Sequence, residues 1–270
     1  MKFIHTSDWH IGRLFQNISL LEDQLHVLQQ VKSYAREHGV DALVIAGDVF
    51  DRSIPPAEAV DALDKFLDEI INELKIPVIM ISGNHDSAKR LRFGARHMQQ
   101  SGLHILSKLD SVTIPVIIET KTGPVHFYGI PYHDPVEVRE AFNCEVKTYD
   151  EAHTHVVDLV KEVRISDTPA VLISHCFIDG AEESDSERPL SIGGADRVSY
   201  QPLEDFDYVA LGHLHGPQYK GKEHIRYSGS LLKYSFSEYQ KKKGIALVEL
   251  DEKGFVSMEH LTLTHNLMTL

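Results

Sequence analysis

The stretch that decides the fold is "DALVIAGDVFD" (residues 41–51), an apolar run that stops at a glycine and is followed by two aspartates. An unbroken apolar run of this length is typical of a strand buried on both faces of a sheet. Similar runs lie on either side of it, "KFIHTS" at 2–7 and "IPVIMISGNHD" at 76–86. The segments between them have helical spacing, so the first hundred residues predict a βαβαβα order and a largely parallel sheet.

The predicted helices are placed by their caps and their apolar spacing. The first begins near Ser19, which has capping-box spacing with Glu22, and ends at Gly39. The second begins at the proline pair 55–56, and the third covers residues 87–102. The core-facing residues are expected to be Leu21, Leu25, Leu28, Val31 and Ala35 in the first helix and Val60, Leu63, Leu67, Ile70 and Leu74 in the second.

The second half of the chain is richer in strands. A turn is expected at the Gly-Pro pair 123–124, a helix over about 148–163, and a hairpin over 244–263 with its turn at 251–254. Further strands are predicted at 112–120, 124–132, 169–175, 207–213 and 225–230. We therefore expect an α/β fold of the α+β kind, with two mixed β-sheets packed face to face and helices outside. The polar segment 180–198 is predicted to be a long loop, of the kind that is usually functional or disordered.

Length and composition narrow the class of protein. The 270 residues fit one large domain or one domain with an extension, and 42% of them are apolar. No apolar run approaches the ~20 residues of a membrane helix, and the first residues lack a secretory signal. Two cysteines, Cys144 and Cys176, provide no disulfide framework, which indicates a reducing cytoplasm. The net charge of −13 argues against a generic nucleic-acid binder, unless bound metal ions supply positive charge locally.

Several predicted strands end in residues that bind metals or transfer protons. Since sites in α/β folds gather at the carboxyl ends of strands, these ends are expected to converge on one cleft. His213 and His215 are two residues apart, and the alternation of a strand would turn both rings to one face. The full set, in chain order, is Asp8, His10, Asp48, Asp51, Asn84, His85, Asp86, His175, His213 and His215.

Each of these pieces also has a simpler explanation. A lone D-x-H pattern, such as that of Asp8 and His10, occurs often by chance in protein sequences. A G-D or G-N pair is typical of a turn. A single histidine such as His175 fits a hydrogen-bonded core residue. Five pieces in order, each after an apolar strand, are not explained by independent turns. The conjunction therefore favours a site for two metal ions.

The order D-x-H, G-D-x-x-D, G-N-H-D, a strand-ending His and G-H-x-H resembles the calcineurin-like metallophosphoesterase superfamily. Within it, "TSDWHIGR", "GDVFDRSIPP", "GNHDS", "SDSERPLSIGG" and "YSGSLLKYSFSE" closely resemble the SbcD family, the nuclease subunits of bacterial SbcCD complexes. The resemblance runs from Met1 to about Leu250, and it implies a four-layer sandwich with a nuclease domain over 1–270. SbcD chains usually continue into a capping domain and a segment that binds the SbcC ATPase, so we expect those parts to be absent here.

The resemblance also implies roles at the site. Two divalent ions about 3.5–4 Å apart hold both the attacking and the leaving oxygen of a phosphoryl displacement, and Asp48 would bridge them. Nitrogen and oxygen donors suit Mn, Fe, Co or Zn, whereas the family points to Mn²⁺. The remaining ligands would be Asp8, His10 and His215 for one ion and Asn84, His175 and His213 for the other.

His85 is expected to stabilise the transition state or to protonate the leaving oxygen, rather than to bind metal. A carboxylate partner would fix its tautomer, with Asp51 as the first choice for that partner and Asp86 as the second. Asp86 equally fits an N-cap of the helix that begins near Ser87.

Basic residues near the site offer contacts to phosphates. The set that fits contacts to DNA phosphates is Arg13, Arg52, Lys89, Arg90, Arg92 and Arg96. A solvated helix face explains the same cluster. Residues 241–243, all lysine, are expected in a solvated turn, and Trp9 is expected to pack against the sheet rather than to stack on a base.

The resemblance implies a Mn²⁺-dependent DNA exonuclease and endonuclease that acts on duplex ends and hairpins in DNA repair, recombination and replication. Its partner would be an SbcC-type ATPase, and a homodimer is expected through the helices at 56–75 and 88–100. The apolar faces of these helices are equally explained by packing on the sheet alone. Phosphomonoesterases and cyclic-nucleotide phosphodiesterases use the same chemistry, but the SbcD-like loops argue against them. A non-catalytic scaffold would be expected to have lost metal ligands, and this chain keeps them all.

Overall fold

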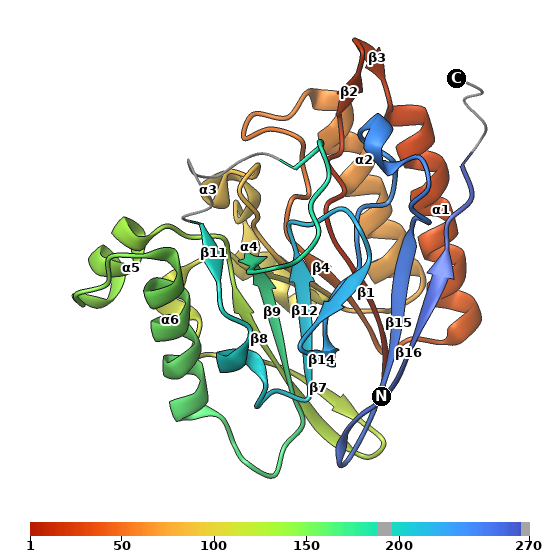
Figure 1. Ribbon diagram of the computed structural model, residues 1–270. Coiled ribbons are helices and arrows are strands. Elements are labelled where there is room, and N and C mark those ends of the chain that lie inside the picture. Colours follow the sequence, from red (N-terminus) through yellow and green to blue (C-terminus); the bar gives the residue numbers. More distant parts are fainter. Residues whose placement is uncertain (188–195, 266–270) are drawn as a thin grey trace.

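The computed structural model describes residues 1–187 and 196–265. This part of the chain forms two six-stranded mixed sheets that pack face to face, with helices over the outer face of each (Figure 1). The layered α/β sandwich predicted from the order of strands and helices is confirmed. None of the helices in the described ranges is both long enough and apolar enough to span a membrane.

The first sheet has the strand order β16-β15-β1-β4-β5-β6. Its four parallel strands are β1 (Lys2–Thr6), β4 (Ala42–Ala46), β5 (Val78–Ile81) and β6 (Leu103–Leu106). The predicted hairpin adds two antiparallel strands at one edge, β15 (Gly244–Asp251) and β16 (Gly254–Thr262). The strand at 41–51 is therefore an inner strand, as its apolar run predicts.

The second sheet has the strand order β13-β14-β12-β9-β8-β7. Its strands are β7 (Val116–Thr120), β8 (Gly123–Ile130), β9 (Ala170–His175), β12 (Tyr208–Gly212), β13 (Gln218–Lys220) and β14 (Lys222–Tyr227). The four inner strands are parallel, and β7 and β13 run antiparallel at the edges. The predicted turn at 123–124 is wrong, because these two residues open β8 and the turn lies just before them.

Two short strand pairs were not expected from the sequence. One is the hairpin of β2 (Leu14–Phe15) and β3 (Ile18–Ser19), and the other is the parallel pair of β10 (Phe177–Ile178) and β11 (Arg197–Val198). The second pair shows that the end of the predicted loop 180–198 is a strand. Residues 188–195 of that loop lie outside the described part of the chain.

The helices lie on the two outer faces. On the first sheet are α1 (Leu21–His38) and α2 (Ala57–Asp68), which continues into the π-helical turn η1 (Glu69–Glu73). On the second are α5 (Pro135–Phe142) and α6 (Tyr149–Val163). The shorter elements are α3 (Ala88–Leu91), α4 (Ala95–Met98), η2 (Gln99–Ser101), η3 (Leu109–Ser111), η5 (Gln201–Leu203) and η6 (Phe236–Glu238).

The first helix differs from its prediction in its cap and in its buried face. It begins at Leu21, and Ser19 Oγ accepts the Leu21 N–H instead of forming a capping box. Leu25 is exposed, and Gln24 is buried in its place. The reason is that the Gln24 amide donates to the carbonyls of Trp9 and His10, in the loop after β1. A polar residue thus joins this helix to the loop that follows β1.

The second and third predicted helices are also corrected. In α2 the buried face is Ala59, Ala62, Leu63 and Phe66, whereas Val60 is exposed. The predicted helix at 87–102 is broken into α3, α4 and η2. Gly94, with φ of 74°, lies at the break, in the left-handed region that glycine adopts without strain.

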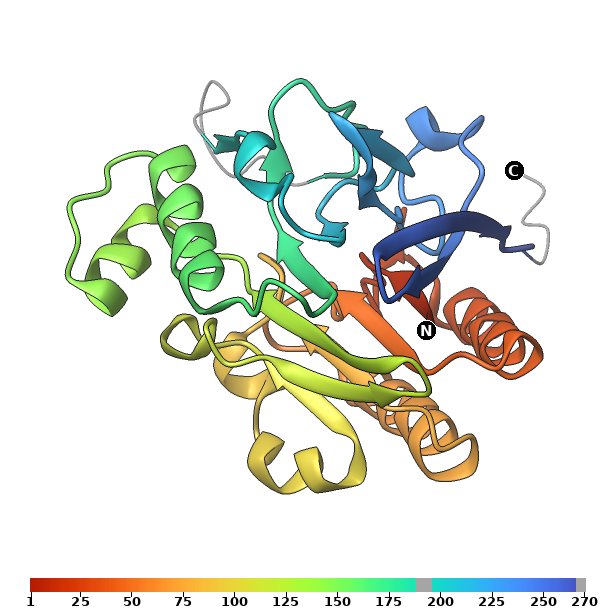
Figure 2. The same cartoon turned by 90° about the horizontal axis from the view of Figure 1, so that it is seen from below.

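Three apolar layers follow from the alternation of side chains along the strands. In β4, Leu43 and Ile45 face α1 and α2, whereas Ala42, Val44 and Ala46 face the second sheet. A third layer lies between the second sheet and α5 and α6. Figure 2 shows the two helical layers on opposite sides of the paired sheets. Strands buried on both faces are therefore apolar at nearly every position.

Aromatic rings fill the layer between the sheets. The Phe3 ring of β1 packs edge-on against Phe127 of β8 and Tyr208 of β12, with centroids 5.5 and 5.6 Å apart. All three side chains are buried. This layer fixes the distance between the two sheets, and hence between the loops at their ends.

We predict that Phe127→Ala lowers the free energy of unfolding by about 3–5 kcal/mol, because it leaves a cavity in this closed layer. Phe93→Ala is the matched control. Its ring is 84% exposed, and its loss is expected to change the free energy by less than about 0.5 kcal/mol. Urea unfolding followed by circular dichroism measures both values. Equal effects of the two variants would contradict the described packing.

Candidate metal centre

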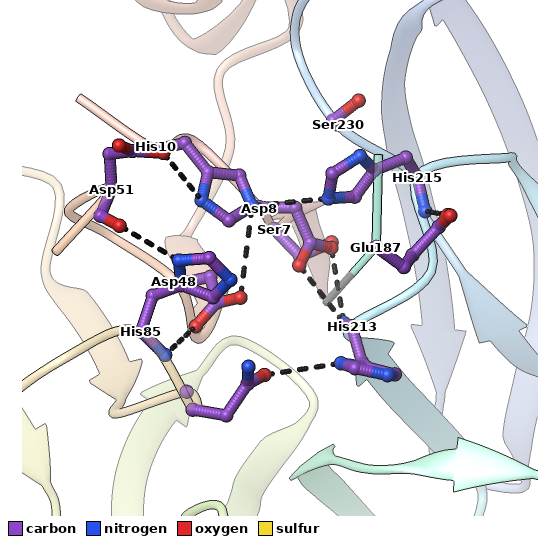
Figure 3. Close-up of polar contacts among 12 residues, drawn as sticks. Ser7, Asp8, His10, Asp48, Asp51, His85, Glu187, His213, His215 and Ser230 are labelled. Atoms are coloured by element: carbon purple, nitrogen blue, oxygen red, sulfur yellow. Dashed lines mark hydrogen bonds and ion pairs between the residues drawn. The ribbon is translucent and has the colours of Figure 1, made fainter. Parts of the chain in front are cut away.

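The ends of the parallel strands from both sheets meet at one edge of the sandwich. His175, the last residue of β9, donates through Nδ1 to the carbonyl oxygen of Ala46, the last residue of β4, at 2.8 Å. His213, just after β12, donates its backbone N–H to the Asp8 carboxylate at 3.0 Å. The predicted convergence of strand ends is therefore present in the structure. Figure 3 shows some of the side chains that meet there, among them Asp8, Asp48 and His213.

Glycines permit this close approach. A Cβ on Gly212 would overlap the carbonyl oxygen of Ala46 and lie 2.8 Å from His175 Nδ1. A Cβ on Gly83 would overlap the Asp48 side chain and backbone. Neither glycine has a positive φ, so their function is to give space rather than to form a left-handed turn.

Four of the predicted ligands have left-handed backbones. Asp8, His10, Asp48 and His213 have φ angles of 53°, 45°, 49° and 106°. Such angles are unfavourable for residues with a Cβ and are kept only where the surrounding structure enforces them. Here backbone bonds enforce them, including Asp8 N to Gly47 O at 3.1 Å and His10 N to Asp48 O at 3.0 Å.

The explanation for the spacing of His213 and His215 is also corrected. Strand β12 ends at Gly212, so neither ring is turned by the alternation of a strand. The unusual φ of His213 redirects the chain instead. Both rings reach the site, but they contact different partners: His213 Nδ1 lies 3.1 Å from Asn84 Oδ1, and His215 Nε2 lies 3.1 Å from His10 Nε2.

One half of the site is formed by Asp8, His10 and His215. Their ligand atoms lie within 4.8 Å of one another, and all three side chains are buried. Two nitrogens bound at about 2.0–2.1 Å to one ion are separated by roughly 3 Å, which fits the 3.1 Å between the two Nε2 atoms. These three residues are suited to one cation.

The other half is formed by Asn84, His175 and His213. Asn84 Oδ1 lies 3.0 Å from His175 Nε2 and 3.1 Å from His213 Nδ1. The amide and the two imidazoles thus direct their polar atoms at one point. The Asn84 Nδ2 atom is buried with no hydrogen-bond partner among the described residues. Oδ1 is the amide atom that contacts both imidazoles.

Asp48 lies between the two halves. Its Oδ2 is 3.7 Å from His10 Nε2 on one side and 3.5 Å from His175 Nε2 on the other. Its Oδ1 accepts the backbone N–H of His85 at 2.8 Å, which fixes the carboxylate plane. One oxygen is therefore held by the backbone, and the other is free to face both halves.

The electrostatics of the site also suit cations. Burial raises the pKa of Asp8 to about 6 and, together with Asp48, that of Asp86 to about 7. Although burial opposes it, the charge of Asp48 raises the pKa of His175 to about 9, and His175 in turn lowers that of Asp48. Within 1–187 and 196–265, no lysine or arginine pairs with the Asp8 or Asp48 carboxylate. Bound divalent ions would supply the missing positive charge.

His85 lies beside the proposed ligands, but the prediction that a carboxylate holds its ring is wrong. Its Nδ1–H donates to the backbone carbonyl of Asp51 at 2.8 Å, and not to a carboxylate. The Asp51 carboxylate instead lies 3.5 Å from Arg13 and 3.7 Å from His10 Nδ1. The pairing with Arg13 turns it away. The carbonyl still fixes the ring, with Nε2 as the free nitrogen.

Asp86 has neither of its predicted roles. It does not cap α3, whose N-cap is Ser87 without a side-chain bond, and it is not the partner of His85. Its carboxylate accepts three backbone N–H groups, from Val49 at 3.1 Å, Phe50 at 3.0 Å and Gly83 at 2.9 Å. Asp86 therefore joins the loops after β4 and β5.

The basic residues do not form one patch. Arg13 is turned inward, to Asp51, to the Ser186 carbonyl and over the Tyr234 ring. Arg52 and Arg90 line a groove of about 370 Å³ between α2 and α3, and Lys89 is exposed beside it. The remaining two, Arg92 and Arg96, line a different groove of about 720 Å³ at the edge strands β6 and β7.

Several residues around the site were not predicted from the sequence. They are Gln24, Ser186, Glu187, Glu238 and Lys243. Lys243 is a correction, because it is buried and paired with Glu238 rather than exposed in a turn. Although burial opposes it, contacts with His215 and Lys243 hold the pKa of Glu238 below its usual value. Ser186 and Glu238 lie in the segments "SDSER" and "SFSE", which resemble the SbcD family. That resemblance gave no role for either residue.

Two remaining expectations agree with the structure. Trp9 is fully buried and packs edge-on against Phe66 of α2, so it is not available to stack on a base. Cys144 and Cys176 are both free thiols.

Comparison with known proteins adds to this geometry. The family model for calcineurin-like phosphoesterases matches residues 1–217. The SbcD subunit of the SbcCD nuclease from Staphylococcus epidermidis is 38% identical over 258 residues, which cover 95% of this chain and 68% of the relative. Two solved structures are similar: a Thermus thermophilus protein (15% identity, TM-score 0.55, 97% of this chain and 99% of that one) and a dimetal phosphatase of Danio rerio (13%, 0.52, 98% and 99%). At these identities the two structures support the fold alone.

We predict that metal binding at pH 7 releases protons, to which His175 contributes. With its pKa near 9, this ring holds two protons in the metal-free protein, and a ligand nitrogen must lose its proton. Apparent affinity for Mn²⁺ should therefore rise with pH up to about 9. Calorimetric titration in two buffers of different ionisation enthalpy measures the release. A heat that does not depend on the buffer would contradict the protonated His175.

Proposed function

Because the chain belongs to the calcineurin-like phosphoesterase family, we propose that it is a metal-dependent nuclease that hydrolyses phosphodiester bonds of DNA. The observation that carries the proposal is the position of Asp48, whose Oδ2 faces His10 on one side and His175 on the other. A carboxylate oxygen shared in this way suits two adjacent divalent ions. Such ions, when bound, activate water and neutralise the charge that builds on the phosphate.

The two halves of the site divide the ligands between the ions. Asp8, His10 and His215 would hold one, Asn84, His175 and His213 would hold the other, and Asp48 would contact both. The nitrogen and oxygen donors do not distinguish among Mn, Fe, Co and Zn, and we propose Mn²⁺ from the family.

His85 would act on the leaving oxygen. Its Nδ1–H is held by the Asp51 carbonyl, so the acid would be the imidazolium form, whose second proton, on Nε2, is available to the substrate. The ring packs edge-on against His10, with centroids 4.6 Å apart, so it lies beside the ligands. A general acid at this place would protonate the departing sugar oxygen.

DNA as substrate is supported by the relative, which is named a nuclease subunit. We propose duplex ends and hairpins as substrates, an SbcC-type ATPase as partner, a homodimer, and a role in DNA repair, recombination and replication in the cytoplasm. Arg52, Lys89 and Arg90 are exposed and follow Asp51 and His85 within a few residues in the chain, so they are suited to contact phosphates. With a net charge of −13, the chain would depend on these residues and on bound metal for DNA binding.

The proposal is tested with an end-labelled DNA hairpin and Mn²⁺, with and without an SbcC-type ATPase. We expect cleavage by the wild-type chain, and a loss of at least about 10³-fold in Asp48→Asn, since both ions would lose their shared ligand. The same samples are given a phosphomonoester and a cyclic nucleotide. Hydrolysis of either of these, with intact DNA, would replace the nuclease by a small-molecule phosphoesterase.

The role of His85 gives a second prediction. His85→Ala should slow hairpin cleavage by about 10²–10⁴-fold, because a sugar alkoxide leaves poorly without a proton. A p-nitrophenyl phosphodiester has a good leaving group, and its hydrolysis should fall far less. His97→Ala, an exposed histidine of α4, is the matched control and should leave both rates unchanged. Equal losses with the two substrates would argue that His85 is not the acid.

A further inference from the structure

His215 is held by a line of buried polar side chains from two distant loops. Its Nδ1 lies 2.6 Å from Ser186 Oγ, and Ser186 Oγ donates to Glu238 Oε1. Glu238 is fully buried and forms an ion pair with Lys243, which is also buried. The line therefore runs from the candidate metal centre to an ion pair that solvent does not reach.

The ion pair decides which atom donates along this line. An ionised carboxylate accepts hydrogen bonds and donates none. Ser235 also donates to Glu238 Oε1, at 3.1 Å, whereas Ser184, 3.3 Å from that oxygen, lies 2.6 Å from Glu187 Oε2 and gives its one proton there. Ser186 therefore gives its one proton to Glu238, and its oxygen is left to accept a proton from His215 Nδ1. This arrangement selects the tautomer of His215 that carries its proton on Nδ1.

The selected tautomer matters because of what Nε2 faces. Nε2 of His215 lies 3.1 Å from Nε2 of His10 and belongs to the buried group with Asp8. A ligand nitrogen must be free of its proton to bind a metal ion. A proton on Nδ1 leaves Nε2 in that state.

The same two loops also hold the main chain of His215. Its N–H donates to Glu187 Oε1 at 2.8 Å, and its carbonyl accepts from Lys243 Nζ at 2.7 Å. Lys243 Nζ also donates to Ser230 Oγ at 2.7 Å. Figure 3 shows Glu187 and Ser230 on either side of His215. Ring and backbone are thus fixed together by residues 184–187 and 230–243.

We propose that Glu238 is a positioning residue that acts through Ser186 to hold His215 in the Nδ1–H tautomer and so presents its Nε2 to the metal ion. This assigns a purpose to the "SDSE" and "SFSE" segments, whose residues are not among the proposed metal ligands. The inference rests on the proposed function, since it concerns a ligand of the proposed two-metal site.

The tautomer is tested directly in the metal-free wild-type chain. Long-range ¹H–¹⁵N spectra of histidine-labelled protein distinguish the two tautomers, and His215→Asn identifies the signal. We expect Nδ1–H for His215 in the wild type, and a shift toward Nε2–H or a mixture in Ser186→Ala. An Nε2–H tautomer in the wild type, or an unchanged Nδ1–H tautomer in Ser186→Ala, would overturn the proposal.

Metal affinity provides the second measurement, with Mn²⁺ alone as the probe. Ser186→Ala and Glu238→Gln should each weaken one of the two ions by about 10–100-fold, as is usual for partners that orient a ligand. Ser235→Ala is the matched control, because Ser235 donates to the same oxygen of Glu238 without contacting His215. Equal Mn²⁺ affinities for Ser186→Ala and Ser235→Ala would refute the proposal that Glu238 acts on His215 through Ser186.

Glu238→Gln leaves the Lys243 ammonium buried without its ion-pair partner. Its Mn²⁺ affinity is therefore interpreted only if the variant has the circular dichroism spectrum of the wild type. Ser186→Ala removes a single hydroxyl and decides the question if Glu238→Gln does not fold. Neither readout needs DNA. A chain with two Mn²⁺ ions and the expected tautomer that leaves DNA intact would refute the proposed function but not this inference.

Discussion

The structure depends on one carboxylate that two sets of ligands share. Asp48 Oδ2 faces His10 from the first sheet and His175 from the second, while Oδ1 is held by the backbone of His85. This contact requires the two sheets to end at the same edge with little space between them. Gly83 and Gly212 provide that space, since a side chain on either would overlap the neighbouring loop. The packing between the sheets is thus a condition for the site and not only for stability.

The same edge concentrates unfavourable features that a stable fold would otherwise avoid. Asp8, His10, Asp48 and His213 have left-handed backbones, and the Asp8 carboxylate is buried with no lysine or arginine of the described residues paired to it. Each of these features costs free energy in the metal-free chain, and strained backbone of this kind is typical of functional sites. Divalent cations would relieve the carboxylate burial. Of the eight non-glycine residues with positive φ in the described part of the chain, four lie at this edge.

The sequence predicts what is local and misses what tertiary contacts decide. Asp8, Asp48 and His175 could be found because each follows an apolar strand of a recognisable length. Gln24 could not, since helical spacing favours the neighbouring leucine and only the carbonyls it binds explain its burial. Lys243 follows two other lysines, a composition typical of a solvated turn, and its burial depends on Glu238. The layered sandwich was therefore predictable, whereas helix breaks and partner atoms were not.

Four histidines of the site, His10, His85, His175 and His215, differ in the group that contacts their Nδ1 atom. His175 donates through Nδ1 to the Ala46 carbonyl and His85 to that of Asp51, so the backbone fixes these two rings. His215 depends on the Ser186 side chain, and His10 Nδ1 has no hydrogen-bond partner among the described residues. A backbone carbonyl remains an acceptor whatever side chain is present, but a serine hydroxyl accepts or donates according to its own partner. Of these rings, His215 is the one whose Nδ1 faces a serine, and the proton of that serine is directed by the buried ion pair of Glu238 and Lys243.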